Sequence, residues 1–84
     1  NVWLPRKQAF LVHQGKSIHI VEFQSGKTLH TLENPLRADQ IYEVAASPDE
    51  KRVAASLMDG RGLWSVGLWD VESNAFLGLQ ELPR

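Results

Sequence analysis

The sequence contains no cysteine, so disulfide bonds and thiolate metal sites are excluded. It also lacks an excess of charge of one sign, because nine basic residues are balanced by ten acidic ones and the formal net charge is −1. That balance does not favour nucleic acid or an anionic membrane surface as a partner. No apolar run approaches the roughly 18 residues that a membrane-spanning helix needs.

Helical periodicity is missing as well. No stretch keeps apolar residues at the i, i+3, i+4, i+7 spacing over three turns, so no helix is predicted. Turn-forming Pro, Gly, Asn and Asp recur at short intervals instead, separated by runs rich in Val, Ile, Leu and Phe, which is typical of all-β structure. The predicted strands cover residues 2–3, 9–13, 17–23, 28–32, 41–46, 52–57, 65–71 and 75–79.

The chain also repeats itself. Leu4-Pro5-Arg6-Lys7 corresponds to Ser47-Pro48-Asp49-Glu50, and the strand that holds Val21 corresponds to the strand that holds Trp69. The two prolines lie 43 residues apart, whereas Val21 and Trp69 lie 48 residues apart. This difference predicts an insertion of about five residues around positions 60–64, in the inner hairpin of the second repeat.

Ser47-Pro48-Asp49, followed by two short strands that end on Trp69-Asp70, resembles a WD40 repeat, which is the four-stranded blade of a β-propeller. The resemblance implies an all-β fold of two adjacent four-stranded antiparallel blades of an incomplete β-propeller. A truncated first blade would occupy residues 1–35, and a complete second blade with a lengthened inner hairpin would occupy residues 36–84.

Two blades do not close a propeller, since closed propellers have about four to eight. We therefore expect the remaining blades to come from the same longer chain or from other copies. The sequence starts at Asn1 without a methionine, which favours a segment of a longer chain.

The polar residues suggest no reaction centre. Ser47-Pro48-Asp49 is a turn motif in which side chains bond local backbone, and no feature places His13, His19 or His30 beside Ser47 as a base. The three histidines do not have a metal-ligand spacing. We expect no catalytic residue, metal or cofactor, and we expect Trp69 to pack between the two sheets.

The loop over residues 58–64 is the best candidate for binding. It combines two glycines with Arg61 and Trp64, and Arg and Trp are the residue types enriched at interface hot spots. In the WD40 family this loop and the loop between blades lie on the face used most often for binding. The alternative is that Trp64 packs back onto its own hairpin or a neighbouring blade. The predicted partner-binding residues are Arg37, Asp39, Met58, Asp59, Arg61, Leu63 and Trp64.

Three functions are compatible with these patterns. The first is a non-enzymatic scaffold of WD40 type that binds a protein or peptide, favoured by Leu68-Trp69-Asp70-Val71. The second is an accessory or gating propeller similar to those of TolB and prolyl-oligopeptidase relatives, favoured by the insertion. The third is a propeller enzyme with ligands around its central channel, for which Ile41-Tyr42-Glu43 supplies only one carboxylate.

Overall fold

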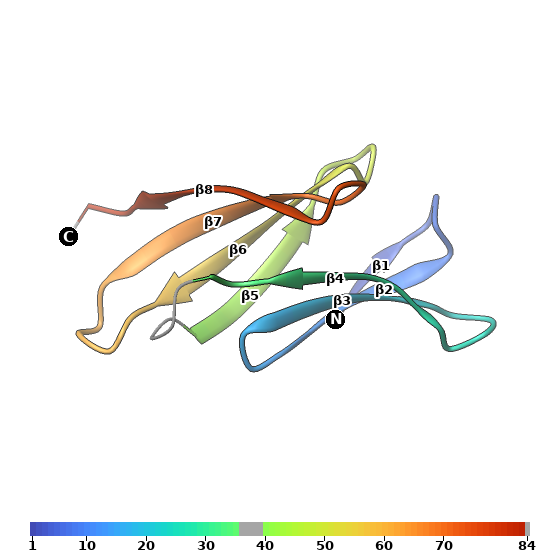
Figure 1. Cartoon of the computed structure of the whole chain (residues 1–84), viewed down its shortest axis with the longest axis horizontal. Coiled ribbons are helices and arrows are strands. Elements are labelled where there is room, and N and C mark those ends of the chain that lie inside the picture. Colours follow the sequence, from blue (N-terminus) through green and yellow to red (C-terminus); the bar gives the residue numbers. More distant parts are fainter. Residues whose placement is uncertain (36–39, 84) are drawn as a thin grey trace.

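The computed structural model describes residues 1–35 and 40–83, and it contains strands and turns but no helix within them (Figure 1). Accordingly, the described residues include no apolar helix of the length needed to cross a bilayer. The strands are β1 (Val2–Leu4), β2 (Ala9–Gln14), β3 (Ser17–Glu22), β4 (Thr28–Glu33), β5 (Gln40–Ala46), β6 (Arg52–Met58), β7 (Trp64–Asp70) and β8 (Ala75–Glu81).

The strands form two separate four-stranded antiparallel sheets. Their orders are β1-β2-β3-β4 and β5-β6-β7-β8, so every strand pairs with its neighbour in sequence. This confirms the predicted all-β architecture of two adjacent four-stranded antiparallel sheets, and both sheets are consistent with propeller blades. The predicted strand bounds agree with the observed ones to within one or two residues.

The hydrophobic core lies between the two sheets. In the stack, β1 and β2 lie against β5, and β4 lies against β8. Each sheet therefore contributes one of its faces to the core, and the alternation of side chains along a strand leaves its other face outward. The first sheet contributes Leu4, Ala9, Leu11, Ile18, Ile20 and Leu32, and the second contributes Ile41, Val53, Ala55, Leu57, Trp69 and the adjoining Val71.

The internal repeat appears in the strand register. Val21 pairs with Phe10 in the first sheet, and Trp69 pairs with Val53 in the second, as their equivalence predicts. The pairing with the fourth strand of each sheet is irregular just before both residues. The register shifts between Ile20 and Val21 in the β3–β4 pair, and between Leu68 and Trp69 in the β7–β8 pair. Trp69 is fully buried against the first sheet, whereas Val21 lies on the outward face of its own sheet. The two sheets thus bury opposite faces of one repeated unit.

Polar contacts also join the sheets. The indole Nε1 of Trp69 donates to the main-chain oxygen of Glu33 over 2.9 Å. The buried carboxylate of Glu50 accepts hydrogen bonds from the main-chain N–H groups of Arg6 (2.8 Å) and Lys7 (3.0 Å). The turn between β1 and β2 is therefore held on the turn between β5 and β6.

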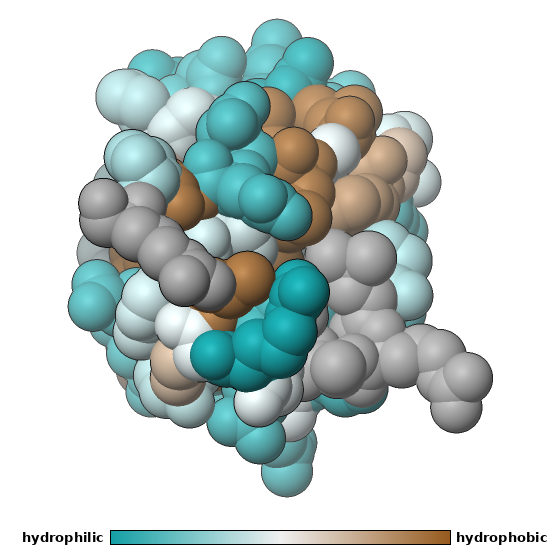
Figure 2. All heavy atoms as spheres, turned by 90° about the vertical axis from the view of Figure 1, so that its left-hand side faces the viewer, coloured by the Kyte–Doolittle hydropathy of each residue, from teal (hydrophilic) through white to brown (hydrophobic). Residues whose placement is uncertain are grey.

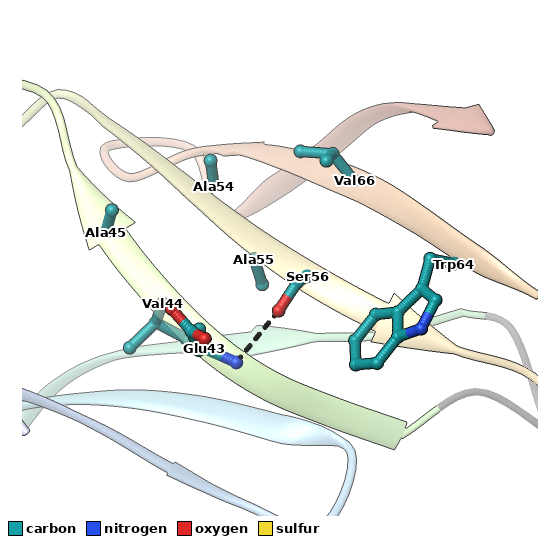
Figure 3. A pocket seen from close by; sticks show the side chains of 8 residues that line it. All are labelled: Glu43, Val44, Ala45, Ala54, Ala55, Ser56, Trp64 and Val66. Carbon is teal, nitrogen blue, oxygen red and sulfur yellow. Dashed lines mark hydrogen bonds between the residues drawn. The ribbon is translucent and has the colours of Figure 1, made fainter. Parts of the chain in front are cut away.

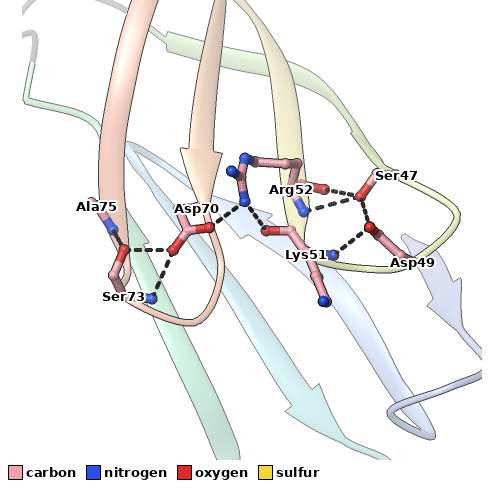
Figure 4. A network of polar contacts seen from close by, with 7 residues as sticks. All are labelled: Ser47, Asp49, Lys51, Arg52, Asp70, Ser73 and Ala75. Atoms are coloured by element: carbon pink, nitrogen blue, oxygen red, sulfur yellow. Dashed lines mark hydrogen bonds and ion pairs between the residues drawn. The ribbon is translucent and has the colours of Figure 1, made fainter.

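The Ser47-Pro48-Asp49 motif forms the predicted turn (Figure 4). Asp49 accepts from the Ser47 hydroxyl and the Lys51 N–H, while the Ser47 oxygen accepts from the Arg52 N–H. The Arg52 guanidinium continues the network to Asp70, and the other carboxylate oxygen of Asp70 accepts from the N–H and hydroxyl of Ser73. These polar side chains organise turns, as the Ser47-Pro48-Asp49 motif predicts.

Candidate binding loop

The predicted binding loop joins β6 to β7 at the end of the molecule opposite the Ser47-Pro48-Asp49 turn (Figure 1). This hairpin is longer than its counterpart, because five residues separate β6 from β7 whereas Gly15 and Lys16 alone separate β2 from β3. Seen from this end, the surface is mostly hydrophilic, with a hydrophobic patch on one flank (Figure 2).

Asp59 organises the loop. Its Oδ1 accepts hydrogen bonds from the N–H groups of Arg61 (2.8 Å) and Leu63 (3.0 Å). Its Oδ2 accepts from Nε and Nη2 of Arg61 at 3.2 and 2.9 Å. Gly62 donates to the Asp59 carbonyl over 3.1 Å and has a φ of 79°, a left-handed conformation that glycine adopts without steric cost. One carboxylate therefore fixes both the backbone of the loop and its guanidinium.

These contacts also set the charge of the loop. The N–H of Leu63, followed by the side chain and backbone of Arg61, lowers the pKa of Asp59 below its ordinary value of 3.8. Asp59 is therefore ionised at neutral pH and balances Arg61. The Arg61 side chain is 75% exposed, so its guanidinium is oriented by Asp59 and the side chain is still open to a partner.

Trp64 begins β7 and lies half-exposed at 40% of its area. Its ring contacts Tyr42 with the centroids 5.1 Å apart and the planes inclined by 62°, a favourable edge-to-face arrangement. A bulge in β5 between Ile41 and Glu43 leaves Tyr42 as an extra residue, also exposed at 42%. Trp64 thus packs partly on its own sheet and keeps the rest of its surface open.

A depression of about 330 Å³ lies beside the loop. Its apolar wall continues beyond the loop onto the end of the chain after β8, where the N–H of Leu82 donates to the carbonyl of Trp64 over 3.0 Å. The lining residues are Arg61, Gly62, Leu63, Trp64, Leu82 and Pro83.

The structure brings some of the predicted site residues together. Arg61, Leu63 and Trp64 line the depression together, and Asp59 is hydrogen-bonded to Arg61 and Leu63 behind it. Met58 is half-buried and does not line the depression. Arg37 and Asp39 lie outside the described residues.

Sequence reasoning missed Tyr42 and Leu82. A bulge has no simple signal in the sequence, and Leu82 is positioned by a main-chain bond of the β7–β8 pair. Neither position could therefore be found from residue types alone.

The histidines lie apart from this loop. His13 pairs with Ile18 and His19 with Val12, so they are not directly opposite each other in the register. His19 contacts the Thr31 hydroxyl at 3.3 Å, and His30 contacts the side-chain oxygen of Asn74 at 2.9 Å. Across residues 1–35 and 40–83, no three His, Asp or Glu side chains gather in a way that would hold a metal ion.

Comparison of the sequence with protein-family models and with curated proteins, and of the fold with solved structures, finds no match.

Proposed function

We propose that this chain is a two-blade segment of a WD40-type β-propeller and serves as a non-enzymatic scaffold that binds a protein or peptide. The observation that carries the proposal is the loop between β6 and β7. It presents a large aromatic surface, Trp64, and an oriented guanidinium, Arg61, next to an apolar depression. Side chains of these two types supply much of the binding energy at protein interfaces.

The rigidity of the site supports this role. Asp59 fixes the backbone and the Arg61 side chain before any partner arrives, so less conformational entropy is lost on binding. The Tyr42 ring likewise restricts Trp64. A partner with an acidic group beside an apolar side chain would match the Arg61 guanidinium and the depression lined by Leu63 and Leu82.

The test uses a random peptide library displayed on phage and selected against the whole chain. Selected peptides are then titrated against the wild type, Arg61→Ala and Trp64→Ala. Each substitution should weaken binding by about 1–3 kcal/mol while the fold stays intact.

Lys51→Ala is the control, because Lys51 is an exposed cation in the turn between β5 and β6, at the opposite end (Figure 1). Equal affinity for all variants, with unchanged melting temperatures, would remove this loop from the binding site. Loss of folding in Trp64→Ala would show that its ring serves the hairpin instead.

A second candidate is an accessory or gating propeller similar to those of TolB and prolyl-oligopeptidase relatives. The long β6–β7 hairpin favours it. In that case the selected peptides would bind without regard to Arg61 and Trp64, and the sequence flanking this segment would encode a catalytic or secretion domain.

A further inference from the structure

The repeat makes the two faces of each sheet distinguishable. In the second sheet the face with Val53, Ala55 and Trp69 packs on the first sheet. The equivalent positions of the first sheet are Phe10, Val12 and Val21, and they face outward. The reverse holds for the other face: Leu11, Ile18 and Ile20 are buried, while their equivalents Ala54, Val66 and Leu68 face outward.

Outer face 1, on the first sheet, carries an aromatic cluster. Trp3 lies 4.9 Å from Phe10 and 6.2 Å from Phe23 between ring centroids, and Phe23 is 70% exposed. The cluster borders a hollow of about 260 Å³ over Val21, the position that Trp69 fills in the second sheet. Outer face 1 is defined by Trp3, Phe10, Val12, Val21 and Phe23.

Outer face 2, on the second sheet, carries smaller side chains than outer face 1. Ala45, Ala54 and Val66 line a shallow groove of about 440 Å³ that ends at Trp64 (Figure 3). Leu68 extends this face and is 39% exposed. Outer face 2 is defined by Ala45, Ala54, Val66 and Leu68.

Side-chain volumes on the two outer faces depart from the internal interface in opposite directions at most positions. Outer face 1 has larger side chains at four positions, with Trp3 for Ala46, Phe10 for Val53, Val12 for Ala55 and Phe23 for Val71, and smaller ones where Val21 and Thr28 stand for Trp69 and Phe76. Outer face 2 is smaller at three positions, with Ala45 for Val2, Ala54 for Leu11 and Val66 for Ile18. A pair of faces that fills space to native density needs such compensation.

The charged residues at equivalent positions of the two turns also have opposite signs. Inside the chain, the Glu50 carboxylate of the second sheet accepts the main-chain N–H groups of Arg6 and Lys7 in the turn of the first sheet. In the repeat, Lys7 stands at the position of Glu50, and Asp49 stands at the position of Arg6. When outer face 1 meets outer face 2 in the geometry of the internal interface, Lys7 therefore faces a turn that holds a carboxylate.

We propose that outer face 1 of one copy of this chain packs on outer face 2 of a second copy, head to tail, and repeats the interface found inside each chain. Unlike faces meet in this contact, so it is heterologous, and it gives a ring where the rotation between copies closes and an open filament where it does not. The number of copies rests on the proposed propeller function: because closed propellers have about four to eight blades, the ring would hold roughly two to four copies. Trp64 lines the groove of outer face 2 as well as the depression beside the loop, so assembly and loop binding share this side chain, whereas Arg61 and Leu63 line the depression and not the groove.

Two substitutions separate the faces. Phe23→Glu places a charge on outer face 1, Leu68→Glu places one on outer face 2, and both positions are exposed in a single copy, so the fold should survive. Lys16→Gln changes the net charge equally in the exposed β2–β3 turn and is the control. Sedimentation velocity then measures the assembly of each protein, alone and mixed.

The wild type and Lys16→Gln should form a closed ring, and each face variant alone should associate about 100-fold more weakly, because a buried unpaired carboxylate disrupts an apolar contact. A mixture of the two face variants should form a one-to-one dimer, because each partner keeps one intact face. A monomeric wild type at high concentration would overturn the proposal. So would a face variant that still assembles alone, or a mixture that does not pair.

Discussion

The indole Nε1 of Trp69 donates a hydrogen bond to the main-chain oxygen of Glu33, 2.9 Å away on the other sheet. Trp69 is the largest fully buried side chain, and its ring also packs edge-on against Phe76 at 5.1 Å. Trp69 thus buries an apolar ring between the sheets and also makes a hydrogen bond to the end of β4. Its Trp-Asp neighbourhood in the sequence predicts a structural residue, and this contact shows how it acts.

Trp69→Ala should destabilise the chain by about 3–5 kcal/mol, because a buried aromatic ring is replaced by a cavity. Trp69→Phe keeps most of the apolar volume and loses the N–H donor, so its cost should be about 1–2 kcal/mol. Urea denaturation followed by circular dichroism measures both values. Trp64→Ala removes the same ring from a half-exposed position and should cost much less. Equal losses for the two alanine variants would contradict the role of Trp69.

Gly67 lies in close contact with the Trp69 ring. A Cβ atom added there would lie 3.0 Å from Cη2 and 3.1 Å from Cζ3 of Trp69, and 3.2 Å from Cδ1 of Leu57. Gly67→Ala should therefore cost about 1–3 kcal/mol through overpacking. Gly60→Ala is the matched control, since a Cβ there meets no atom within 4 Å and its φ is not left-handed. A stable Gly67→Ala chain would mean that the ring moves freely between the sheets.

The strands could be predicted because their sequences obey local rules. Runs rich in β-branched residues, such as Ile18 to Val21, are bounded by turn residues, and these rules recover the strand bounds and the repeat register. The sequence also identifies Asp59 and Trp64 as part of an unusual loop. Local rules do not reveal the hydrogen bonds that fix the loop, in which one oxygen of Asp59 accepts from the N–H groups of both Arg61 and Leu63.

Contacts between distant segments could not be predicted. Glu50 sits in a turn that is rich in charge, where solvation is the ordinary expectation, yet it is 3% exposed because the β1–β2 turn covers it. Tyr42 reaches Trp64 through a bulge, and Phe23 joins Trp3 across the outer face of the sheet. These relationships depend on stacking and local backbone irregularity, which leave no pattern in a single sequence.

Stability should fall at acid pH. Hydrogen bonds from Ser47 to Asp49, from Leu63 to Asp59 and from Ser73 to Asp70 lower the pKa of each carboxyl below 3.8. The folded chain then binds fewer protons than the unfolded one below about pH 4, so the stabilisation is complete above that pH. It is lost as the pH falls through the folded-state pKa values.

Urea midpoints measured between about pH 6 and pH 2 test this dependence. Asp59→Asn and Asp70→Asn should each be less stable than the wild type at the upper end and show a shallower decline toward the lower end. A decline as steep as that of the wild type in both variants would show that other carboxyl groups control acid unfolding.

The Glu50 carboxylate should contribute more to the contact between sheets than any surface charge. Its two oxygens accept the N–H groups of Arg6 at 2.8 Å and Lys7 at 3.0 Å, and the residue has a φ of 62°. Glu50→Gly removes the acceptor but also relieves the strain of the left-handed backbone. Any fall in the free energy of unfolding is therefore due to the lost carboxylate side chain and not to backbone strain. We expect a loss of about 1–3 kcal/mol, because two amides are left without an acceptor at a buried contact.

Gln8→Gly is the matched control. Gln8 also has a left-handed φ, 53°, but its side chain donates only to Pro5 within its own turn, at 2.7 Å. This variant should be neutral or slightly more stable, because glycine adopts a left-handed φ without strain. Glu50→Ala should be less stable than Glu50→Gly, since alanine lacks the carboxylate and keeps the strain. If Glu50→Gly unfolds at the same urea concentration as Gln8→Gly, the carboxylate does not hold the two sheets together.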